Sequence, residues 1–359
     1  MKTRKIPAIA IVVIITIGII SYLHRGNEQK RDDAIIRIGA VLPLSGNLAQ
    51  LGESGKAGLL LAEEYINSKN GKRIKIYFED GKGNPTASVN ATNKLIVVDK
   101  IDIMFSIISA VELSIVPIQE KYKFLMFSHS SHPELSGVNN LFFRHSQTVQ
   151  QESDFIISNM DDVSPITLCY MQDDYGIAFE NEMRNKLRSD RIKASISFLS
   201  SETNFSTIAH KIKDSQPDKV VICAGGRNIS NLVKKLREQN YGGEIITTLA
   251  YIVSGANATT KDINGLSMID FKPINMDKEF GDFVHRYEND NGKKIGTAEL
   301  MFFDSAWIVY ANSVNGNAPN EISSAIKKQT TQDILGNFVT VTDTNDILPE
   351  LIFIKQRKE

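Results

Sequence analysis

Residues 37–67 constrain the fold of this chain more than any other segment, because they join a strand pattern to a helix pattern. A short apolar run ends at Leu42, where Pro43 and a polar stretch stop the strand. Beyond Gly55, apolar residues recur at three- and four-residue spacing, which predicts one face in a core and one in solvent. A strand, a polar loop over residues 45–52 and a helix predict the first unit of a doubly wound α/β sheet, where ligands bind at the carboxyl ends of strands.

The length of the chain predicts two domains. At 359 residues it exceeds the size of about 250–300 residues at which single hydrophobic cores stop growing. A formal net charge of -1 gives no support for a nucleic-acid surface, and we expect no nucleic-acid partner. Its partners must therefore be inferred from sites and not from bulk charge.

The N-terminus carries an 18-residue uncharged run at residues 6–23, preceded by Lys2, Arg4 and Lys5. As a helix this run is about 27 Å long, nearly the thickness of a bilayer core. An uncleaved anchor is slightly favoured, and a cleaved signal peptide remains open. Residues 1–33 are therefore assigned to a signal or anchor segment with a polar tether, and both alternatives place the rest of the chain outside the cytoplasm.

The chain has two cysteines, Cys169 and Cys223, and each lies in an apolar run of strand character. This pattern predicts two buried free thiols, because such runs are core strands. A disulfide between them in an oxidising compartment remains open. Two cysteines do not complete a metal site without further ligands.

Strand and helix patterns alternate along most of the chain. After the first strand, strands are predicted at residues 74–78, 101–108, 124–127, 166–171, 194–198, 219–223 and 245–248. Helices are predicted at residues 87–98, 115–122, 178–188, 205–212, 229–239, 278–287, 297–313 and 321–328. Residues 336–354 again have strand character. Two successive βα series predict two α/β lobes.

Several segments in this order resemble the leucine-binding-protein-like group of type I periplasmic solute-binding proteins. The segments are IGAVLPLSGNLAQLGESGKAGLLLAEEYIN, DGKGNPTASVNATNKLI, SIISAVELSIVPIQEKYKFLMFSHSSHPELS, DDYG, NFSTIAHKIKDSQPDKVVICAGG and FFDSAW. The resemblance covers nearly all of residues 35–355. It implies two Rossmann-like lobes joined by a three-segment hinge that close on a small solute. Lobe 1 would comprise residues 35–144 plus 270–331, and lobe 2 residues 145–269 plus 332–359.

The resemblance also implies a ligand site. In the family, a serine follows the third strand and a run of small residues follows the fourth, where hydroxyls and amides hold a carboxylate. The matching residues are Ser109 and then Ser128, His129, Ser130 and Ser131. We expect ligand contact from Ser109, Ser130 and Ser131, with helix capping or turn formation as the alternative role.

Three positions depart from the family pattern. Leu51 stands where many amino-acid-binding members have an aromatic residue, and Ala224 stands where they have a tyrosine. The stretch around Tyr251 lacks the expected carboxylate, and an ammonium buried without one is costly. These departures disfavour a branched-chain amino acid. The alternative sources of polar contact are Tyr251, Glu112, Asp173 and Glu299.

Other site types have weaker support. The segment SHSSHPEL places His129 and His132 three residues apart, but Pro133 indicates a loop and no third ligand is well spaced, so we expect no metal. The chain contains no Gly-x-Ser-x-Gly elbow, and Gly225–Gly226 lacks the Lys-Ser/Thr pair of a P-loop. We therefore expect no catalytic residues and no cofactor. The aromatic residues of 297–313 are expected in the core.

Together these observations predict a monomeric, extracytoplasmic solute-binding protein of an ABC importer. It would bind a small polar or carboxylate-bearing solute, such as an amino acid or an amide, and deliver it to a membrane permease. Two alternatives remain: a ligand-sensing regulatory module that acts on a partner protein, and, with weaker support, a hydrolase on the same scaffold.

Overall fold

The computed structural model describes most of the chain after residue 34. The described residues are 35–69, 71–254, 265–272, 276–292, 294–313, 318–328, 331–332, 338–339 and 341–355. The N-terminal segment predicted at residues 1–33 lies outside them. Within the described ranges, no helix is both long and apolar enough to cross a membrane.

The first sheet has six strands in the order β13-β5-β4-β3-β1-β2. Their bounds are β1 Ile35–Leu42, β2 Arg73–Asp80, β3 Ile103–Ser106, β4 Leu125–Ser128, β5 Phe142–His145 and β13 Asp346–Ile347. Strand β1 pairs in parallel with β3, β3 with β4, β4 with β5, and β5 with β13. Their carboxyl ends therefore lie along one edge, where loops are free to form a site.

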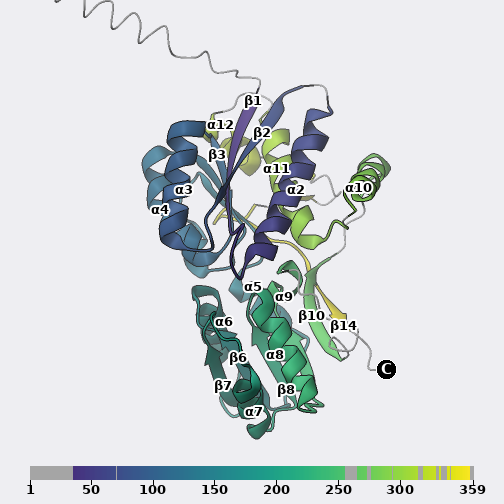
Figure 1. Ribbon diagram of the computed structural model, residues 1–359. Helices are drawn as coiled ribbons and strands as arrows, with labels where there is room; N and C mark the ends of the chain where they lie inside the picture. Colours follow the sequence, from purple (N-terminus) through teal and green to yellow (C-terminus); the bar gives the residue numbers. More distant parts are fainter. Residues whose placement is uncertain are drawn as a thin grey trace, which may run out of the picture. The chain divides into compact units, whose positions relative to one another are not determined.

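Helices cover both faces of this sheet, and together they form lobe 1 (Figure 1). On β3, Ile103 and Phe105 face one hydrophobic cluster while Met104 faces another, as the two-residue period of a strand requires. The first cluster includes α2 Ala49–Asn67, α10 Lys278–Asn291, α11 Thr297–Ala311 and α12 Pro319–Lys328. The second includes α3 Pro85–Lys94 and α4 Ser109–Tyr122.

The second sheet also has six strands, in the order β14-β10-β9-β8-β6-β7. Their bounds are β6 Ile166–Met171, β7 Ile192–Phe198, β8 Lys219–Cys223, β9 Glu244–Thr247, β10 Leu266–Phe271 and β14 Leu351–Lys355. Only β14 pairs antiparallel, with β10. Lobe 2 consists of this sheet with α5 Val149–Ser158 and α6 Asp174–Lys186 on one face and α7 Ser206–Asp214 and α8 Gly226–Glu238 on the other.

The two cysteines are buried free thiols on opposite faces of the second sheet. Cys169 belongs to the hydrophobic cluster with α7 and α8, and Cys223 to the cluster with α5 and α6. In the register of β6 and β8, Cys169 pairs with Ile222 and Tyr170 with Cys223, so the two thiols point to opposite sides. This confirms the predicted free thiols and removes the disulfide alternative.

The chain passes between the lobes three times. The first passage, at residues 146–148, follows β5 and leads to α5. The second lies between β10 and α10, and the third, at residues 348–350, joins β13 to β14. A hinge of three short segments is therefore built from residues far apart in the sequence.

Most predicted elements are present, with shifted ends, and β6 and β8 match their predicted ranges. The loop predicted over residues 45–52 is shorter than expected, because α2 already begins at Ala49 and includes Leu51. The helix predicted at 87–98 ends in a π-helical turn, Leu95–Asp99. Strands β5 and β10 and helix α5 were not predicted.

Predicted lobe boundaries differ from the structure at more than one place. Strand β10, in the sheet of lobe 2, continues to Phe271, beyond the predicted boundary before residue 270. Residues 332–359 were assigned to lobe 2, yet β13 at Asp346–Ile347 pairs with β5 in the sheet of lobe 1. The chain returns to lobe 2 only at β14. Two residues are too short a strand to show a period in the sequence, so this pairing had no sequence signal.

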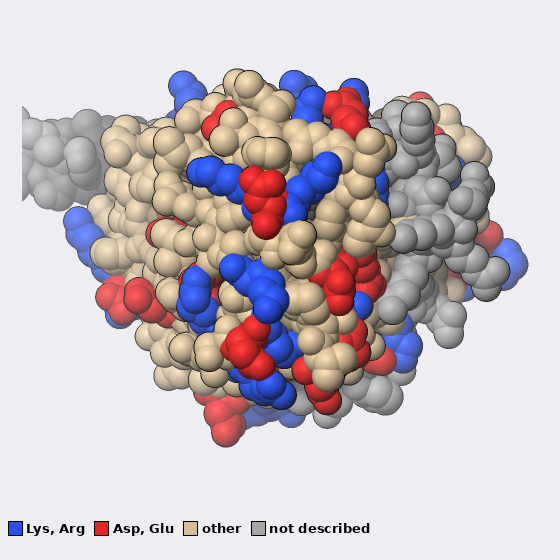
Figure 2. Space-filling view, turned by 90° about the horizontal axis from the view of Figure 1, so that it is seen from below, with Lys and Arg blue, Asp and Glu red and all other residues tan. Residues whose placement is uncertain are grey.

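Charges on the molecular face shown in Figure 2 are of both signs and are interspersed. Basic side chains there lie next to acidic ones, and neither sign forms a separate patch on that face. This distribution agrees with the net charge of -1 and gives that face no character of a nucleic-acid surface.

Candidate functional site

A pocket of about 760 Å³, including its opening to solvent, lies where the two sheets present the carboxyl ends of their strands. From lobe 1 it is lined by Leu48, Leu51, Ile107, Ile108, Ser109, Ala110, His129, Ser130, Ser131 and Met301. From the first hinge segment and lobe 2 it is lined by Ser146, Gln147, Met171, Asp173, Asp174, Tyr175, Gly225, Leu249, Ala250, Val253 and Ser254. Its position is the one expected for a ligand in a doubly wound fold.

The lobe 1 wall presents hydrogen-bond donors. Helix α4 begins at Ser109, so the free N–H groups of its first turn lie at the pocket. Ser130 is 5% exposed, and its Oγ has no hydrogen bond of good geometry with any described residue, although it lies close enough to the Glu112 carboxyl to lower the pKa of that group. Ser131 Oγ accepts from Gln147 Nε2 at 3.0 Å, which leaves the Ser131 hydroxyl proton available for a ligand.

The backbone is strained at the same place. Ile108, which precedes α4 and lines the pocket, has a φ of 85°. A β-branched residue rarely adopts a positive φ, because its side chain clashes with the backbone. Strain of this kind is retained mostly where function requires a particular backbone position, and here it aims the first turn of α4 at the pocket.

A buried glutamate supports the lobe 1 wall from behind. Glu112 is 0% exposed and receives a hydrogen bond from Ser128 Oγ and another from His129 N, the latter at 3.1 Å. Burial raises the pKa of Glu112 to about 8, although Ser128, Ser130 and the His129 amide act in the opposite direction. Glu112 therefore holds the loop after β4 in place and is protonated at neutral pH.

His129 lines the pocket in its neutral form. Its Nδ1 is 3.1 Å from the carbonyl oxygen of Ser106, which only accepts, so Nδ1 carries the proton and Nε2 accepts from Ser305 Oγ at 2.8 Å. Burial, the main cause, and the nearby His145 lower the pKa of His129 to about 3. Both ring nitrogens are thus used within the protein.

His129 and His132 make separate hydrogen bonds within the protein. His132 Nδ1 accepts from Glu134 N at 3.3 Å at the start of a 3-10 turn, away from the bonds of His129. Among the described residues, no group of three or more His, Cys, Asp or Glu side chains is arranged to hold a metal ion.

The lobe 2 wall presents acceptors. Asp173 caps α6 by accepting from Gly176 N at 2.7 Å, and Asp174 follows in the first turn. Behind them, Glu152 accepts from Tyr175 Oη at 2.6 Å and from Leu249 N at 2.7 Å. Burial raises the pKa of Glu152 to about 7. One carboxyl group thus lies behind each wall of the pocket.

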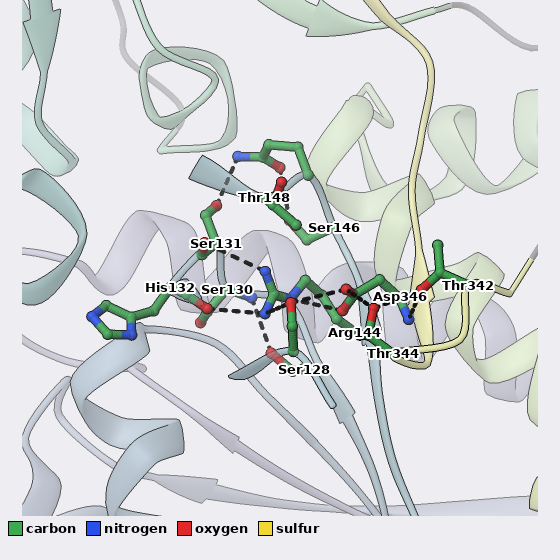
Figure 3. A network of polar contacts seen from close by, with 12 residues as sticks. Ser128, Ser130, Ser131, His132, Arg144, Ser146, Thr148, Thr342, Thr344 and Asp346 are labelled. Carbon is green, nitrogen blue, oxygen red and sulfur yellow. Dashed lines mark hydrogen bonds and ion pairs between the residues drawn. The ribbon is translucent and has the colours of Figure 1, made fainter. Parts of the chain in front are cut away.

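Arg144, in β5, connects the loop after β4, which carries Ser130 and Ser131, to strand β13 (Figure 3). Its side chain is fully buried and donates to the carbonyl oxygen of His132 and to Ser136 Oγ, both at 2.9 Å. On the other side, its Nε forms an ion pair with Asp346 Oδ1 at 3.3 Å. The backbone that carries Ser130 and Ser131 is therefore fixed to β5 and β13, the two strands that lead into the first and third hinge segments.

The structure brings five of the predicted ligand-binding residues to the pocket: Leu51, Ser109, His129, Ser130 and Ser131. Ser128 lies behind the wall with Glu112. Ala224 and Tyr251 are 1% and 2% exposed and pack in the core of lobe 2. Their direct contact with a ligand is not supported by this position.

The four residues named as alternative polar contacts lie in different parts of the structure. Of these, Asp173 lines the pocket, whereas Glu112 is behind the wall. Glu299 accepts from Gly296 N at 3.1 Å at the start of α11. The sequence analysis missed Gln147 and Glu152, whose roles depend on contacts with residues distant in the sequence. Asp174 and Tyr175 were also missed, although they lie within the DDYG segment that carries the family resemblance.

We expect the two buried glutamates to make stability fall between pH 7 and pH 8. In the unfolded chain a glutamate has a pKa of ~4.3. The folded protein keeps protons on Glu112 and Glu152 that the unfolded chain has released, so this contribution is lost as the pH rises through about 7 and 8. The expected loss of unfolding free energy is about 1 kcal/mol, measured by urea unfolding at the two pH values.

The double variant Glu112→Gln with Glu152→Gln is the control, because glutamine keeps the shape and does not titrate. We expect its stability to change much less over this interval. The buried His129 and His145 act in the opposite direction, since their lowered pKa values favour folding as pH rises, but only below their unfolded pKa of ~6.5. A wild-type curve that is flat from pH 7 to pH 8 would contradict the assignment.

Two lobes of parallel sheet with a pocket at the carboxyl ends of their strands define a two-lobed ligand-binding protein. The model of the periplasmic binding protein family matches residues 35–312, and the chain belongs to this family. A relative, Leu/Ile/Val-binding protein homolog 3 of Brucella melitensis, is 26% identical over 246 residues, which are 63% of this chain and 66% of that protein.

Solved structures show the same fold. The substrate-binding protein LivJ from Streptococcus pneumoniae, solved in complex with isoleucine, superposes with a TM-score of 0.81 at 17% identity, over 90% of this chain and 96% of LivJ. An ABC transporter solute-binding protein from R. palustris, in complex with benzoate, gives a TM-score of 0.78 at 16% identity, over 90% and 93% of the two chains. The fold is therefore that of leucine-binding-like, type I periplasmic binding proteins, as the sequence resemblance implied.

Proposed function

We propose that this protein is the solute-binding component of an ABC importer, which captures a small carboxylate-bearing solute in the pocket between its lobes. The observation that carries the proposal is the buried Ser130 hydroxyl, which lines the pocket without a well-formed hydrogen bond to the described residues. A buried hydroxyl of this kind costs free energy until a ligand pairs with it.

The donors of lobe 1 suit a carboxylate. The first turn of α4 at Ser109 supplies N–H groups and the positive end of the helix dipole, and Ser130 and Ser131 supply hydroxyls. No lysine or arginine is among the described residues that line the pocket. The anion would therefore be held by neutral donors, as in the phosphate and carboxylate sites of many helix N-termini.

The remaining wall suits an apolar body. Leu48, Leu51 and Ile107 from lobe 1 lie across the pocket from Met171, Leu249 and Val253. The isoleucine and benzoate held by the two neighbours both combine a carboxylate with an apolar group. A solute of this type would be desolvated by closure of the hinge, and the closed form would be presented to a permease outside the cytoplasm.

The proposal is tested by ligand-induced thermal shifts with a panel of amino acids, amides, carboxylates and sugars. A ligand that binds only the folded state raises the melting temperature. We expect shifts from carboxylate-bearing solutes, and about a tenfold to hundredfold weaker affinity in Ser130→Ala, the cost of a hydrogen bond to a charged group.

The exposed Ser201 offers a matched control, because Ser201→Ala removes the same hydroxyl group at a site far outside the pocket lining. Its affinity should equal that of the wild type. The proposal is wrong if no carboxylate shifts the melting temperature, or if both alanine variants bind equally well.

A further inference from the structure

The end of lobe 1 opposite the pocket is formed by the amino ends of its parallel strands. Asp102 N donates to Arg37 O and Leu125 N donates to Asp102 O, both at 3.0 Å, so the starts of β1, β3 and β4 lie side by side. The carboxyl ends of these strands lead to the pocket instead. The segments that precede the strands therefore share one surface, at the upper end of lobe 1 in Figure 1.

Three large apolar side chains are exposed on this surface. Val97 and Val98 are 65% and 64% exposed, and Tyr122 is 43% exposed. The valines lie in the π-helical turn Leu95–Asp99 that precedes β3, and such turns are rare and occur frequently at functional sites. Tyr122 is the last residue of α4, just before β4. Apolar side chains that gather at one end of a lobe, and are not scattered singly, indicate an interaction surface.

Basic side chains accompany the apolar ones. Lys100, Lys121 and Lys123 are exposed in the same two segments, in which the acidic residues are Asp99 and Glu120. The ammonium of Lys121 lies 4.8 Å from the centre of the Tyr122 ring. An exposed tyrosine next to lysines combines an apolar body with positive charge, which is the composition of surfaces that lie at a lipid–water boundary.

Helix α12 extends the basic surface with Lys327 and Lys328, which are also exposed. Lys327 Nζ donates to Asn140 Oδ1 at 2.8 Å, and the preceding Asn139 donates to Gln119 Oε1 of α4 at 2.7 Å. These bonds bring the end of α12 close to the end of α4. Five lysines against two acidic residues give this surface a formal excess of three positive charges, in a chain whose net charge is -1.

The sequence that precedes β1 argues for a membrane as the partner of this surface. Residues 24–34 join β1 to the uncharged run at residues 6–23, which is long enough to span a bilayer core. Eleven residues reach at most about 36–40 Å. A bilayer that holds the uncharged run would therefore be within reach of the end of lobe 1 at which β1 starts.

We propose that the surface formed by Val97, Val98, Tyr122 and the five lysines binds a membrane that carries anionic phospholipids. The lysines pair with phosphate headgroups, while the valines and the tyrosine enter the boundary with the acyl chains. This contact holds the pocket end of lobe 1 away from the lipid, where it is open to solute. The inference does not depend on which ligand the pocket takes.

The test measures how closely lobe 1 approaches a vesicle. The full chain with Val98→Cys carries a fluorophore on the new thiol, because Cys169 and Cys223 are buried, and it is reconstituted with vesicles that contain an acceptor lipid. With phosphatidylglycerol in phosphatidylcholine, we expect strong energy transfer in about 0.1 M NaCl. In about 1 M NaCl, where the Debye length is about 3 Å, transfer should fall to the level of pure phosphatidylcholine vesicles.

Val163→Cys is the matched label control, since Val163 is 81% exposed and precedes β6 in lobe 2. Its label should give weak transfer that does not depend on anionic lipid or salt.

Lysine variants of the Val98-labelled chain give the magnitude of the effect. Lys100→Gln combined with Lys121→Gln and Lys123→Gln should lower the ratio of docked to undocked protein about hundredfold, at about fivefold for each lysine near an anionic surface. The matched control changes three exposed lysines of lobe 2 to glutamine and should leave the ratio unchanged; they are Lys193, Lys211 and Lys234. Both triple variants should keep the melting temperature of the wild type, which separates docking from folding.

Equal transfer from the Val98 and Val163 labels, or equal docking of the two triple variants, would overturn the proposal. Energy transfer between donor-labelled and acceptor-labelled copies without vesicles, abolished by the lobe 1 triple variant, would also overturn it, because a second copy of the chain would then be the partner.

Discussion

Arg144→Met is expected to lower the free energy of unfolding by about 3–5 kcal/mol, because it removes one partner of a buried ion pair. Asp346, which is 4% exposed, would then keep a buried charge without its cation. The carbonyl oxygen of His132 and the Ser136 hydroxyl would lose their donor at the same time. Figure 3 shows Arg144 between His132 and Asp346, so the loss affects both the loop after β4 and strand β13.

Urea unfolding followed by circular dichroism measures this change. The matched control is Arg188→Met, since Arg188 and Asp190 form an ion pair in which the side chains are 71% and 63% exposed. Exposed pairs contribute about 0–1 kcal/mol, so this variant should remain close to the wild type.

A double variant separates charge from packing. Arg144→Met combined with Asp346→Leu removes both charges, and we expect it to be more stable than Arg144→Met alone, because no unpaired carboxylate remains. Equal stability of Arg144→Met and Arg188→Met would show that the buried pair does not hold the hinge strands together.

Gly58→Ala is expected to cost about 3 kcal/mol of unfolding free energy, because α2 and α11 approach too closely to admit a methyl group. A Cβ at Gly58 would lie 2.0 Å from the carbonyl oxygen of Glu299 in α11. That atom belongs to the backbone of a buried helix and does not move aside like a flexible side chain. Relief would require the two helices to separate, which opens the core of lobe 1.

Gly281 provides the control for this substitution. It lies in helix α10, and a Cβ there meets no atom within 4 Å. Gly281→Ala should therefore raise the unfolding free energy by about 0.5–1 kcal/mol, because alanine has the higher helix propensity. Thermal and urea unfolding should therefore show that Gly58→Ala lowers the unfolding free energy and that Gly281→Ala raises it. If Gly58→Ala also stabilises the protein, the close helix packing is not as described.

The sequence predicted the strands that carry a simple signal and missed those that do not. Strand β6 is an apolar run bounded by polar residues, and its predicted range matches the structure. Strand β5 has the sequence FFRH, in which Arg144 and His145 look unlike buried residues. They are buried because Asp346, two hundred residues later, and Ser305 supply their contacts.

The site predictions agree with the pocket lining better on the lobe 1 side than on the lobe 2 side. Ser109, Ser130 and Ser131 came from the family resemblance, and the structure places them on the pocket wall. On the lobe 2 side the resemblance pointed to Ala224 and Tyr251, which are buried in the core, whereas Asp173, named as an alternative polar contact, lines the pocket. Glu152 reaches Leu249, 97 residues away, and that pairing follows from the order of the strands in the second sheet and has no counterpart in local spacing.

Because the chain passes between the lobes three times, one short segment supplies an edge strand to both sheets. Strand β13 completes the edge of the first sheet and β14 that of the second, and both come from residues 346–355. During synthesis each lobe therefore waits, with an open sheet edge, for the same short stretch of residues 346–355. Contacts of such long sequence separation slow folding. The two lobes should thus mature together, and a ribosome that stalls before residue 346 would leave both of them incomplete.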